Sequence, residues 1–566
     1  MKCAMNFKVR KAFEATKRFV ENNFTFITVM ICCNLPILAT YSNAGTRVAQ
    51  LAYIIVVNAL LALLVGAVPW KKVRRGIQAV IITLSLLFFF VDTYFSFFYQ
   101  GVPDQSTLEV IFATTTAEAS GYIRANMMSL WLYIVFVAVL SLFYLIIRYV
   151  GRFRRNALLV TSLSAGIWLG VILIAVNVVE SECSRDRTTY KRLKYASCSF
   201  LRNTLFTVKA IKNMHALNRM RDGMKTKPVI VRNESSIPYV VYILGESTSR
   251  HRMGMYGYRL DTTPFMSARE KQGGLTRFTD VISPNATTMN VLAKLFSYYR
   301  HDMPGEWYET ADLFTILREA GYYTTWVSNQ EFSGRNGNNA RLYAERCNNY
   351  AFTTYRNSTS STIREPYDEA VLPLLDKTLQ TPRKKNFIVV HLMGSHQLYS
   401  NRFPQERRKF GPESENGPDE KVRSIRADYD NAVRYNDSIV NAIVSRFENK
   451  NAIIVYTSDH GEDVMEINKK AAGHNDINPN QLMVEIPMLV WTSKAFRSTY
   501  PALADRVRRA AHRPFVTEDM IHSLLDLMQI QTPEYRDSLS VFSDQYDATR
   551  PRYFTNRLYR SAPSHP

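Results

Sequence analysis

Cysteine is scarce in this chain: its 566 residues include six, and none of them has the spacing of a zinc finger. The sequence therefore excludes a small disulfide-rich scaffold and a structural zinc site made of cysteines. Cys183 and Cys198 lie close enough in sequence to form a disulfide in an oxidising compartment, and Cys347 would then remain unpaired.

Acidic residues are also few, because 49 Asp and Glu oppose 70 Lys and Arg and leave a net charge of +21. Charges of either sign are almost absent from five runs in the first third of the chain. Each run reaches the ~20 apolar residues that cross a bilayer, and they cover roughly 24–42, 48–69, 77–100, 129–150 and 158–178. We therefore expect five membrane-spanning helices. For the first run, which contains Asn34 and Pro36, a cleaved signal peptide is the alternative.

The basic residues predict how these spans are oriented. Six Lys or Arg precede the first span, and the turns "WKKVRRG" and "GRFRRN" follow the second and fourth spans. The other two connections hold one Arg each, Arg47 and Arg124. By the positive-inside rule the N-terminus is cytoplasmic, and five spans place the C-terminal part outside the cytoplasm.

The positive charge continues into residues 185–227, which hold twelve Lys or Arg against two Asp. Because this tract would lie outside the cytoplasm, we expect no nucleic-acid partner. The apolar spacing of "LRNTLFTVKAIKNMHAL" favours an amphipathic helix on an anionic membrane face, although a solvated linker is the simpler alternative. The predicted organisation is a membrane domain (1–180), a basic linker (181–235) and an exported domain (236–566).

The exported domain alternates strand-like and helix-like segments. Helices are expected at 309–320, 367–379 and 426–447, and a surface loop at 405–424. This alternation predicts a mostly parallel sheet covered by helices. The expected strands are "YVVYILG" (239–245), "YTTWVS" (323–328), "NFIVVHLMG" (386–394), "NAIIVYTS" (451–458) and "IPMLVWT" (486–492).

Three of these strands are followed by acids or histidines. Glu246 follows the first, His396 follows the third, and Asp459 and His460 follow "NAIIVYTS". Ligands gather beyond the carboxyl ends of parallel strands, so we expect these side chains to converge. Carboxylates and imidazole suit zinc. The alternative is a helix cap with an incidental histidine.

Several motifs together resemble one family. "GES…MYGY…TTP", "HLMGSH", "YDNAVRYND" and "SDHGE" are similar to the alkaline-phosphatase-like sulfatase superfamily, and within it to the membrane-bound phosphoethanolamine transferases of Gram-negative bacteria. The resemblance implies five spans followed by a periplasmic α/β sulfatase-like domain with a mostly parallel sheet. Sulfatases proper carry a C/S-x-P-x-R motif, and "SPNAT" lacks its Arg, which argues against sulfatase activity.

The resemblance also implies site residues. It assigns one zinc ion to Glu246, Thr288, Asp459 and His460, with Thr288 as nucleophile and a second zinc during turnover as an option. Thr287 is the rival nucleophile, and a helix cap is the alternative for this Thr-Thr pair. His396 and His474 are expected to bind phosphate or to take part in catalysis, and Asn329 to bind substrate; surface histidines are the alternative for the first two.

A loop between the third and fourth spans resembles the part of lipid A-modifying relatives that receives the ethanolamine headgroup. Thr114 and Glu118 share a helix face at i, i+4, whereas the relatives' Asn is replaced here by Val110. A solvated membrane-surface helix is the alternative. Asp92, within the third span, is by default functional, with extension towards the surface as its alternative.

The activity implied by the family is transfer of phosphoethanolamine from phosphatidylethanolamine to a cell-envelope acceptor, by a multi-pass inner-membrane protein expected to be monomeric. Pro284 and Asn285 replace the relatives' "CG" near the nucleophile. This favours the branch that modifies lipopolysaccharide core, with lipid A or another envelope glycan as further acceptors. The alternatives are a phosphoglycerol transferase that uses phosphatidylglycerol and a catalytically inactive envelope scaffold.

Overall fold

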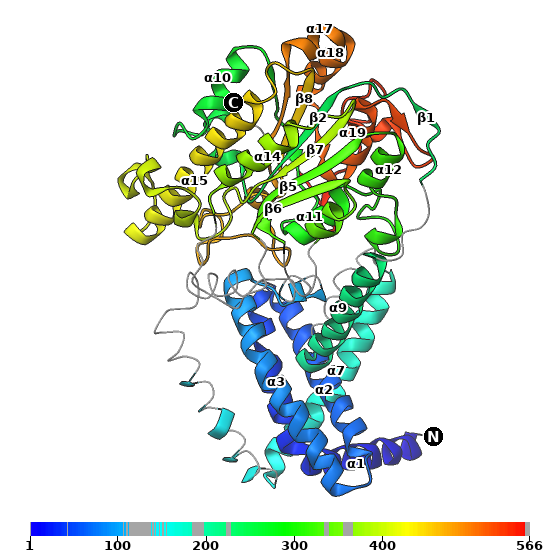
Figure 1. The fold of residues 1–566 in the computed structure, drawn as a ribbon. Coiled ribbons are helices and arrows are strands. Elements are labelled where there is room, and N and C mark those ends of the chain that lie inside the picture. Colours follow the sequence, from blue (N-terminus) through cyan, green and yellow to red (C-terminus); the bar gives the residue numbers. More distant parts are fainter. Residues whose placement is uncertain are drawn as a thin grey trace. The chain divides into compact units, whose positions relative to one another are not determined.

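The structure is a computed structural model that describes residues 2–41, 43–105, 155–183, 197–221, 228–332, 339–354 and 366–560, with scattered residues between 107 and 153. The chain divides into two compact units. The first comprises residues 1–109 and 127–211, and the second comprises residues 110–126 and 212–566. Figure 1 shows the helical first unit and the mixed second unit.

The first unit contains long apolar helices, namely α1 (Lys2–Asn34) continued by η1 (Leu35–Thr40), α2 (Ala44–Gly66), α3 (Lys71–Tyr99) and α7 (Ala157–Cys183). In the described part of the chain, four segments are long and apolar enough to cross a membrane: Lys8–Thr40, Ala44–Gly66, Lys71–Tyr99 and Ala157–Ala175. They match four of the predicted runs, although the first helix begins well before residue 24. Most of the run 129–150 lies outside the described residues, so a count of five stays a prediction.

Asp92 of α3 is buried, with 4% of its surface exposed. Its carboxylate accepts a 2.5 Å hydrogen bond from Ser199 Oγ, forms an ion pair with Arg202, and lies 3.3 Å from Asn203 Nδ2. All three partners lie in the first turns of α9 (Ser199–Arg221). Pairing makes a buried charge tolerable in an apolar unit, so Asp92 anchors the start of the helix that the basic tract forms.

The candidate disulfide between Cys183 and Cys198 is not formed. Cys198 is a free, buried thiol immediately before α9, and Cys347 is also free and buried. Cys198 packs in an apolar cluster with α1 and α2 residues such as Ile27 and Leu61. It therefore contributes to the core of the first unit as a small apolar side chain.

The second unit is built on a seven-stranded sheet of order β3-β9-β8-β2-β7-β5-β6. Every neighbouring pair from β8 to β6 is parallel, whereas β9 runs antiparallel to both β8 and β3. The strands are β2 (Tyr239–Gly245), β3 (Leu275–Phe278), β5 (Tyr323–Glu331), β6 (Asn349–Thr354), β7 (Asn386–His391), β8 (Ala452–Ser458) and β9 (Met488–Thr492). The predicted mostly parallel α/β sheet is confirmed.

Helices cover both faces of this sheet because its central strands are apolar on both sides. Val240 and Tyr242 of β2 pack into one core, and Val241 and Ile243 pack into the opposite one. Figure 1 shows α10, α14 and α15 on one side of the sheet and α11, α12 and α19 on the other. Their bounds are α10 (Pro264–Lys271), α11 (Thr288–Leu295), α12 (Leu313–Glu319), α14 (Val371–Leu379), α15 (Glu420–Ser445) and α19 (Met520–Leu527).

Smaller elements complete the unit. Helices α13 (Asn339–Ala344), α16 (Gln481–Val484), α17 (Lys494–Thr499) and α18 (Pro501–Arg509) lie between strands or after them. Short strand pairs join β1 (Arg232–Asn233) to β11 (Ile530–Gln531), β4 (Val281–Ile282) to β10 (Phe515–Val516), and β12 (Tyr553–Phe554) to β13 (Arg557–Leu558). The predicted loop 405–424 gives way to α15 at Glu420, where the Asp419 side chain accepts from the Val422 amide.

Candidate metal centre

Strand register brings the predicted acids and histidines to one edge of the sheet. β2 lies between β7 and β8, with Leu244 opposite His391 and Gly245 opposite Ser458. All three strands run parallel, so the residues that follow them emerge side by side. Glu246 therefore lies next to the Asp459–His460 pair, and the segment that carries His396 begins at the same edge.

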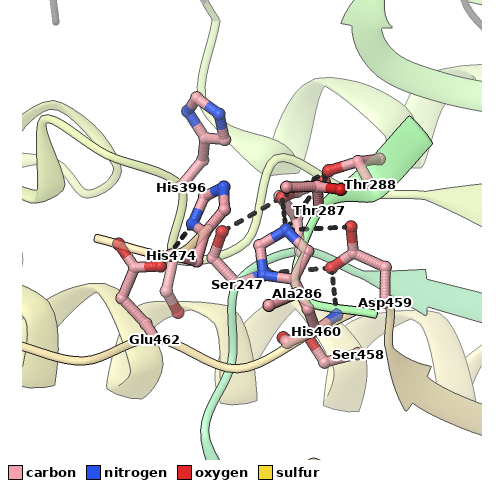
Figure 2. Close-up of polar contacts among 12 residues, drawn as sticks. Ser247, Ala286, Thr287, Thr288, His396, Ser458, Asp459, His460, Glu462 and His474 are labelled. Carbon is pink, nitrogen blue, oxygen red and sulfur yellow. Dashed lines mark hydrogen bonds and ion pairs between the residues drawn. The ribbon is translucent and has the colours of Figure 1, made fainter. Parts of the chain in front are cut away.

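Thr288 completes this group as the first residue of α11. Its Oγ lies 3.2 and 3.3 Å from the two Glu246 carboxylate oxygens and 3.3 Å from His460 Nε2. Figure 2 shows Thr288, Asp459 and His460 pointing towards one another. The Thr287 hydroxyl instead donates to Asp476 Oδ2 at 2.5 Å. Of the two adjacent threonines, Thr288 is the one at the centre.

Local hydrogen bonds leave selected ligand atoms directed inwards. Asp459 Oδ1 accepts from the backbone amides of Ser247 and His460, whereas Oδ2 is buried and accepts no hydrogen bond from any described residue. His460 Nδ1 lies 2.9 Å from the Gly461 carbonyl oxygen. Because a carbonyl only accepts, Nδ1 carries a proton, and the neutral form of the imidazole therefore directs the lone pair of Nε2 into the site.

The spacing of these atoms fits a tetrahedral zinc ion. Ligands at zinc distances of about 2.1 Å are about 3.4 Å apart at the corners of a tetrahedron. His460 Nε2 lies 3.3 Å from Glu246 Oε1, 3.4 Å from Asp459 Oδ2 and 3.3 Å from Thr288 Oγ. The Glu246, Asp459 and His460 ligand atoms all lie within 4.8 Å of one another and are buried.

The electrostatics of the site also favour a cation. Burial and the neighbouring Glu246 carboxylate raise the pKa of Asp459 to about 8. Burial opposes a charge on His460, but Asp459 and Glu246 outweigh it and raise the pKa of its imidazole to about 10. The protein thus concentrates negative charge where a divalent cation would bind, and the donor set fits zinc.

A second group extends from the other side of His460. His474 Nδ1 lies 2.6 Å from Glu462 Oε2, and the His460 and His474 ring centroids are 3.9 Å apart. Tyr399 donates to the other Glu462 oxygen. Burial and the Glu462 charge raise the pKa of the Tyr399 phenol, so it keeps the proton that it donates. His460, Glu462 and His474 could together hold a metal ion. Sequence reasoning included Glu462 in a motif but gave it no role.

His396 lies beside this group, with its ring centroid 6.4 Å from that of His474 (Figure 2). Its loop is fixed by Arg402, whose guanidinium donates to the backbone carbonyls of His396 and Gln397 and lies 3.4 Å from His396 Nδ1. Glu246, Thr288, His396, Asp459, His460 and His474 therefore all lie in one neighbourhood, as the motifs predict.

Asn329 takes a different position. It is buried, and its amide donates to the Pro366 carbonyl and to Asp368 and accepts from Thr353. Successive side chains of a strand point to opposite faces, and its neighbour Gln330 donates to Glu246 Oε2 at 3.0 Å. Gln330 is thus a site residue that sequence reasoning missed, although its place directly after Asn329 on a strand could have revealed it.

A further prediction falls elsewhere. Thr114, Glu118 and Val110 lie outside the described residues, so their roles stay predictions. His391 is fully buried on β7, where burial lowers the pKa of its imidazole to about 4 and keeps it neutral.

Comparison with known proteins identifies the chain. The family model Sulfatase matches residues 238–530, which is more than half of the sequence. The chain belongs to the sulfatase family. A second model, Phosphoethanolamine transferase EptA/EptB, matches residues 54–198 of this sulfatase-family chain. The resemblance predicted from the motifs is confirmed over both units.

Two individual relatives of this sulfatase-family chain are named phosphoethanolamine transferases, in agreement with the second family model. Phosphoethanolamine transferase EptC of Escherichia coli K12 is 31% identical over 331 residues, 57% of this chain and 56% of EptC, so the match spans about half of that relative. Phosphoethanolamine transferase EptA of Helicobacter pylori is 25% identical over 525 residues, 90% of this chain and 93% of that protein.

Solved structures extend the likeness to the fold. The C-terminal periplasmic domain of E. coli EptC in complex with Zn is 29% identical, with a TM-score of 0.54 over 59% of this chain and 95% of that domain. The integral membrane lipooligosaccharide phosphoethanolamine transferase A of Neisseria meningitidis has a TM-score of 0.65 at 20% identity, over 91% of this chain and 97% of that one. The second likeness supports the fold of the whole chain.

Proposed function

We propose that this chain is a membrane-anchored phosphoethanolamine transferase. Its donor is phosphatidylethanolamine, and its acceptor is a sugar or phosphate of lipopolysaccharide core or lipid A. The observation that carries the proposal is the Thr288 hydroxyl, held within 3.3 Å of Glu246 and His460 at the start of a helix. The relatives' names, phosphoethanolamine transferase EptC and EptA, support the transferred group.

The first half of the reaction is attack by Thr288 Oγ on the phosphorus of the donor. Glu246, Asp459 and His460 would hold a zinc ion, whose Lewis acidity would lower the pKa of the Thr288 hydroxyl and offset charge on a phosphate oxygen. The bond from phosphorus to Thr288 forms, and the bond to the diacylglycerol oxygen breaks. The Thr288 hydroxyl gives its proton to an imidazole, for which His396 and His474 are the candidates outside the zinc group, and the leaving diacylglycerol oxygen takes a proton from that imidazole.

The second half returns Thr288 to its hydroxyl form. The acceptor oxygen attacks phosphorus while the bond to Thr288 Oγ breaks. A proton from the acceptor group, or from solvent where an acceptor phosphate carries none, passes through the imidazole to Thr288 Oγ. Glu462 suits this exchange because its carboxylate, 2.6 Å from His474 Nδ1, orients the His474 ring. Helix α11 begins at Thr288, so its first amides favour phosphate charge.

The proposed donor is a lipid, which gives a reason for the membrane-spanning helices of the first unit. We propose an inner-membrane location with a cytoplasmic N-terminus and a periplasmic catalytic unit. The solved C-terminal domain of E. coli EptC is described as periplasmic, and this relative of the same fold supports the placement. Glu118, with Thr114 beside it on the predicted helix, is proposed to pair with the ethanolamine ammonium group.

The test is the covalent intermediate. The full chain in detergent is loaded with zinc, incubated with phosphatidylethanolamine, and examined by intact mass and peptide mapping. We expect one added phosphoethanolamine on Thr288, none in Thr288→Ala, and an adduct still on Thr288 in Thr287→Ser. Thr288→Ala should lower transfer at least ~10³-fold while the protein still binds zinc.

Other results would contradict the proposal in distinct ways. An adduct on residue 287 would reassign the nucleophile. A phosphoglycerol adduct that forms with phosphatidylglycerol, but none with phosphatidylethanolamine, would favour the phosphoglycerol transferase. A zinc-loaded chain that forms no adduct with either lipid would favour single-step chemistry or an inactive scaffold.

A further inference from the structure

Asp476 lies two residues after His474 and connects two distant segments. It is 6% exposed. Its Oδ1 accepts from the Ala286 amide at 2.7 Å and from Thr555 Oγ at 2.9 Å. Its Oδ2 accepts from Thr287 Oγ at 2.5 Å and from Asn290 Nδ2 at 2.8 Å. A carboxylate has about four acceptor positions, so these four bonds satisfy Asp476 fully.

Three of the four donors flank the proposed nucleophile. Ala286 and Thr287 immediately precede Thr288, and Asn290 follows it within the first turn of α11. Asp476 therefore holds the segment on both sides of Thr288, through one backbone amide and two side chains, without contacting the Thr288 hydroxyl. A negative charge at this end of the helix is also electrostatically favourable.

A second contact stabilises the same segment from the helix side. Lys294, near the end of α11, donates from Nζ to Asn285 Oδ1 at 2.7 Å. Asn285 belongs to the loop that delivers Thr288, so the loop is held both by Asp476 and by Lys294. Burial lowers the pKa of the Lys294 ammonium group, and the negative charge of Asp476 offsets part of that effect.

We propose that Asp476 is a positioning residue for phosphoryl transfer, which holds the Thr288 hydroxyl at the Glu246–Asp459–His460 group. This inference rests on the proposed function. Asp476 does not touch the reacting atoms, and its four bonds leave it no capacity to bind substrate. A displacement of ~1 Å at a reacting centre can cost ~10²-fold in rate, so loss of these bonds acts on catalysis.

The first test is Asp476→Asn in the zinc-loaded full chain. The NH₂ group of the new side chain cannot accept the hydrogen bonds that one carboxylate oxygen of Asp476 now accepts, so two donors would face each other. We expect adduct formation on Thr288 in a single turnover to slow ~10- to 100-fold, with the KM for phosphatidylethanolamine within twofold and zinc content unchanged. A role confined to stability would not separate kcat from KM in this way.

Asp437→Asn is the matched control. Asp437 is another buried aspartate of the same unit, 4% exposed, and it accepts from the backbone amides of Phe265 and Met266 at 2.8 and 3.1 Å. It lies on α15, away from Thr288. This variant should lower the Tm without slowing adduct formation.

Thr287 provides a second pair of variants that removes one bond at a time. Thr287→Val keeps the side-chain shape but loses the hydroxyl that Asp476 binds, whereas Thr287→Ser keeps the hydroxyl. We expect Thr287→Val to slow adduct formation on Thr288 and Thr287→Ser to retain the wild-type rate. If Asp476→Asn does not fold, these two Thr287 variants test the positioning role of Asp476 in its place.

Outcomes separate this inference from the proposed function. Wild-type rates in both Asp476→Asn and Thr287→Val, with a normal wild-type adduct, would overturn the positioning role alone. Absence of an adduct on Thr288 in the wild-type chain would overturn both proposals.

Discussion

Glu485 shows how single buried carboxylates hold the loops around the site. It forms an ion pair with Arg250, lies 2.6 Å from His251 Nε2, and accepts from Tyr559 at 2.7 Å. Burial opposes its ionisation, but these partners outweigh burial and lower the pKa of its carboxyl to about 2. Glu485 thus joins the loop after β2 to the C-terminal segment.

Because the pKa of Glu485 is lowered in the folded protein, the stabilisation that its partners provide depends on pH. The stabilisation is complete above the unfolded pKa of about 4.3 and is lost as pH falls towards the folded value of about 2. Glu485→Gln should therefore cost about 1–3 kcal/mol at pH 7, with a smaller difference from wild type at pH 3. Thermal unfolding of the full chain in detergent at both pH values measures this.

Glu234→Gln is the control for that measurement. Glu234 also pairs with an arginine, Arg232, but both side chains are more than half exposed. Exposed pairs contribute little, so this change should be nearly neutral at both pH values. An equal loss in the two variants would show that burial and the Glu485 partners are not the cause.

Site residues that directly follow a strand could be located from the sequence. Site residues that are joined only by contacts between distant segments could not. Glu246, Asp459 and His460 directly follow apolar strands, so local sequence placed them together. Asp476 contacts partners 186 to 190 residues away along the chain, across a loop connection without any local signal. Thr287 and Thr288 are adjacent, and only the three-dimensional contacts distinguish them.

At the scale of elements, the loop after β7 is set by its close approach to β2. Gly394 has φ +51°, and a Cβ atom there would lie 2.5 Å from the Glu246 carbonyl oxygen and 2.8 Å from its amide nitrogen. The Gly394 amide donates to Asp368 at 2.9 Å, and the Ser395 amide donates to the Glu246 carbonyl at 2.9 Å. This turn carries the chain on to His396.

Gly394→Ala should therefore disturb the site. Backbone atoms cannot yield as a flexible side chain does, so the loop and Glu246 must separate. We expect at least ~10-fold slower transfer and a lower Tm, measured on the zinc-loaded full chain. The control is Gly273→Ala, at φ +77° with no described atom within 4 Å, which should cost about 1 kcal/mol of strain and leave transfer intact. Equal transfer rates in the two variants would contradict this explanation.

Strand prediction succeeded where strands are buried on both faces and missed the sheet edges. β2, β7 and β8 are continuous apolar runs. Both ends of β2 were predicted correctly, and the ends of β7 and β8 within three residues. β3 and β6 are the terminal strands of the sheet, and their sequences, "LTRF" and "NYAFTT", carry a mixture of polar and apolar residues. Edge strands are fixed mainly by pairing with a neighbour, which local sequence does not contain.

At the scale of the whole molecule, composition alone separates the two units. Charge-free runs predict spans because a bilayer leaves no alternative to helix for an apolar segment of this length. The start of the first helix was not predictable in this way, since α1 contains many charged residues before its apolar part. The pairing of Asp92 with Arg202 was also hidden, because it joins a span to a helix 110 residues later.

Separating the units tests why a zinc-site enzyme carries membrane helices. A chain that begins at residue 228 lacks the first unit and also residues 110–126 and 212–227 of the second, but it retains the residues of the candidate metal centre. It should still form an adduct on Thr288 with a short-chain soluble phosphatidylethanolamine, at a rate within a few-fold of the full chain. With donor in vesicles its rate should fall at least ~10-fold, because anchoring supplies an effective concentration of about mM.

Re-tethering distinguishes anchoring from direct participation of the membrane unit. The chain from residue 228 is given an N-terminal His tag and bound to phosphatidylethanolamine vesicles that contain a nickel-chelating lipid. Full recovery of the rate means that the first unit acts as an anchor. Partial recovery means that the removed residues also contribute contacts to the headgroup, for which Glu118 is the first residue to replace. No loss of rate in the untethered chain would contradict the anchoring role, since donor lipid would then reach Thr288 without the membrane unit.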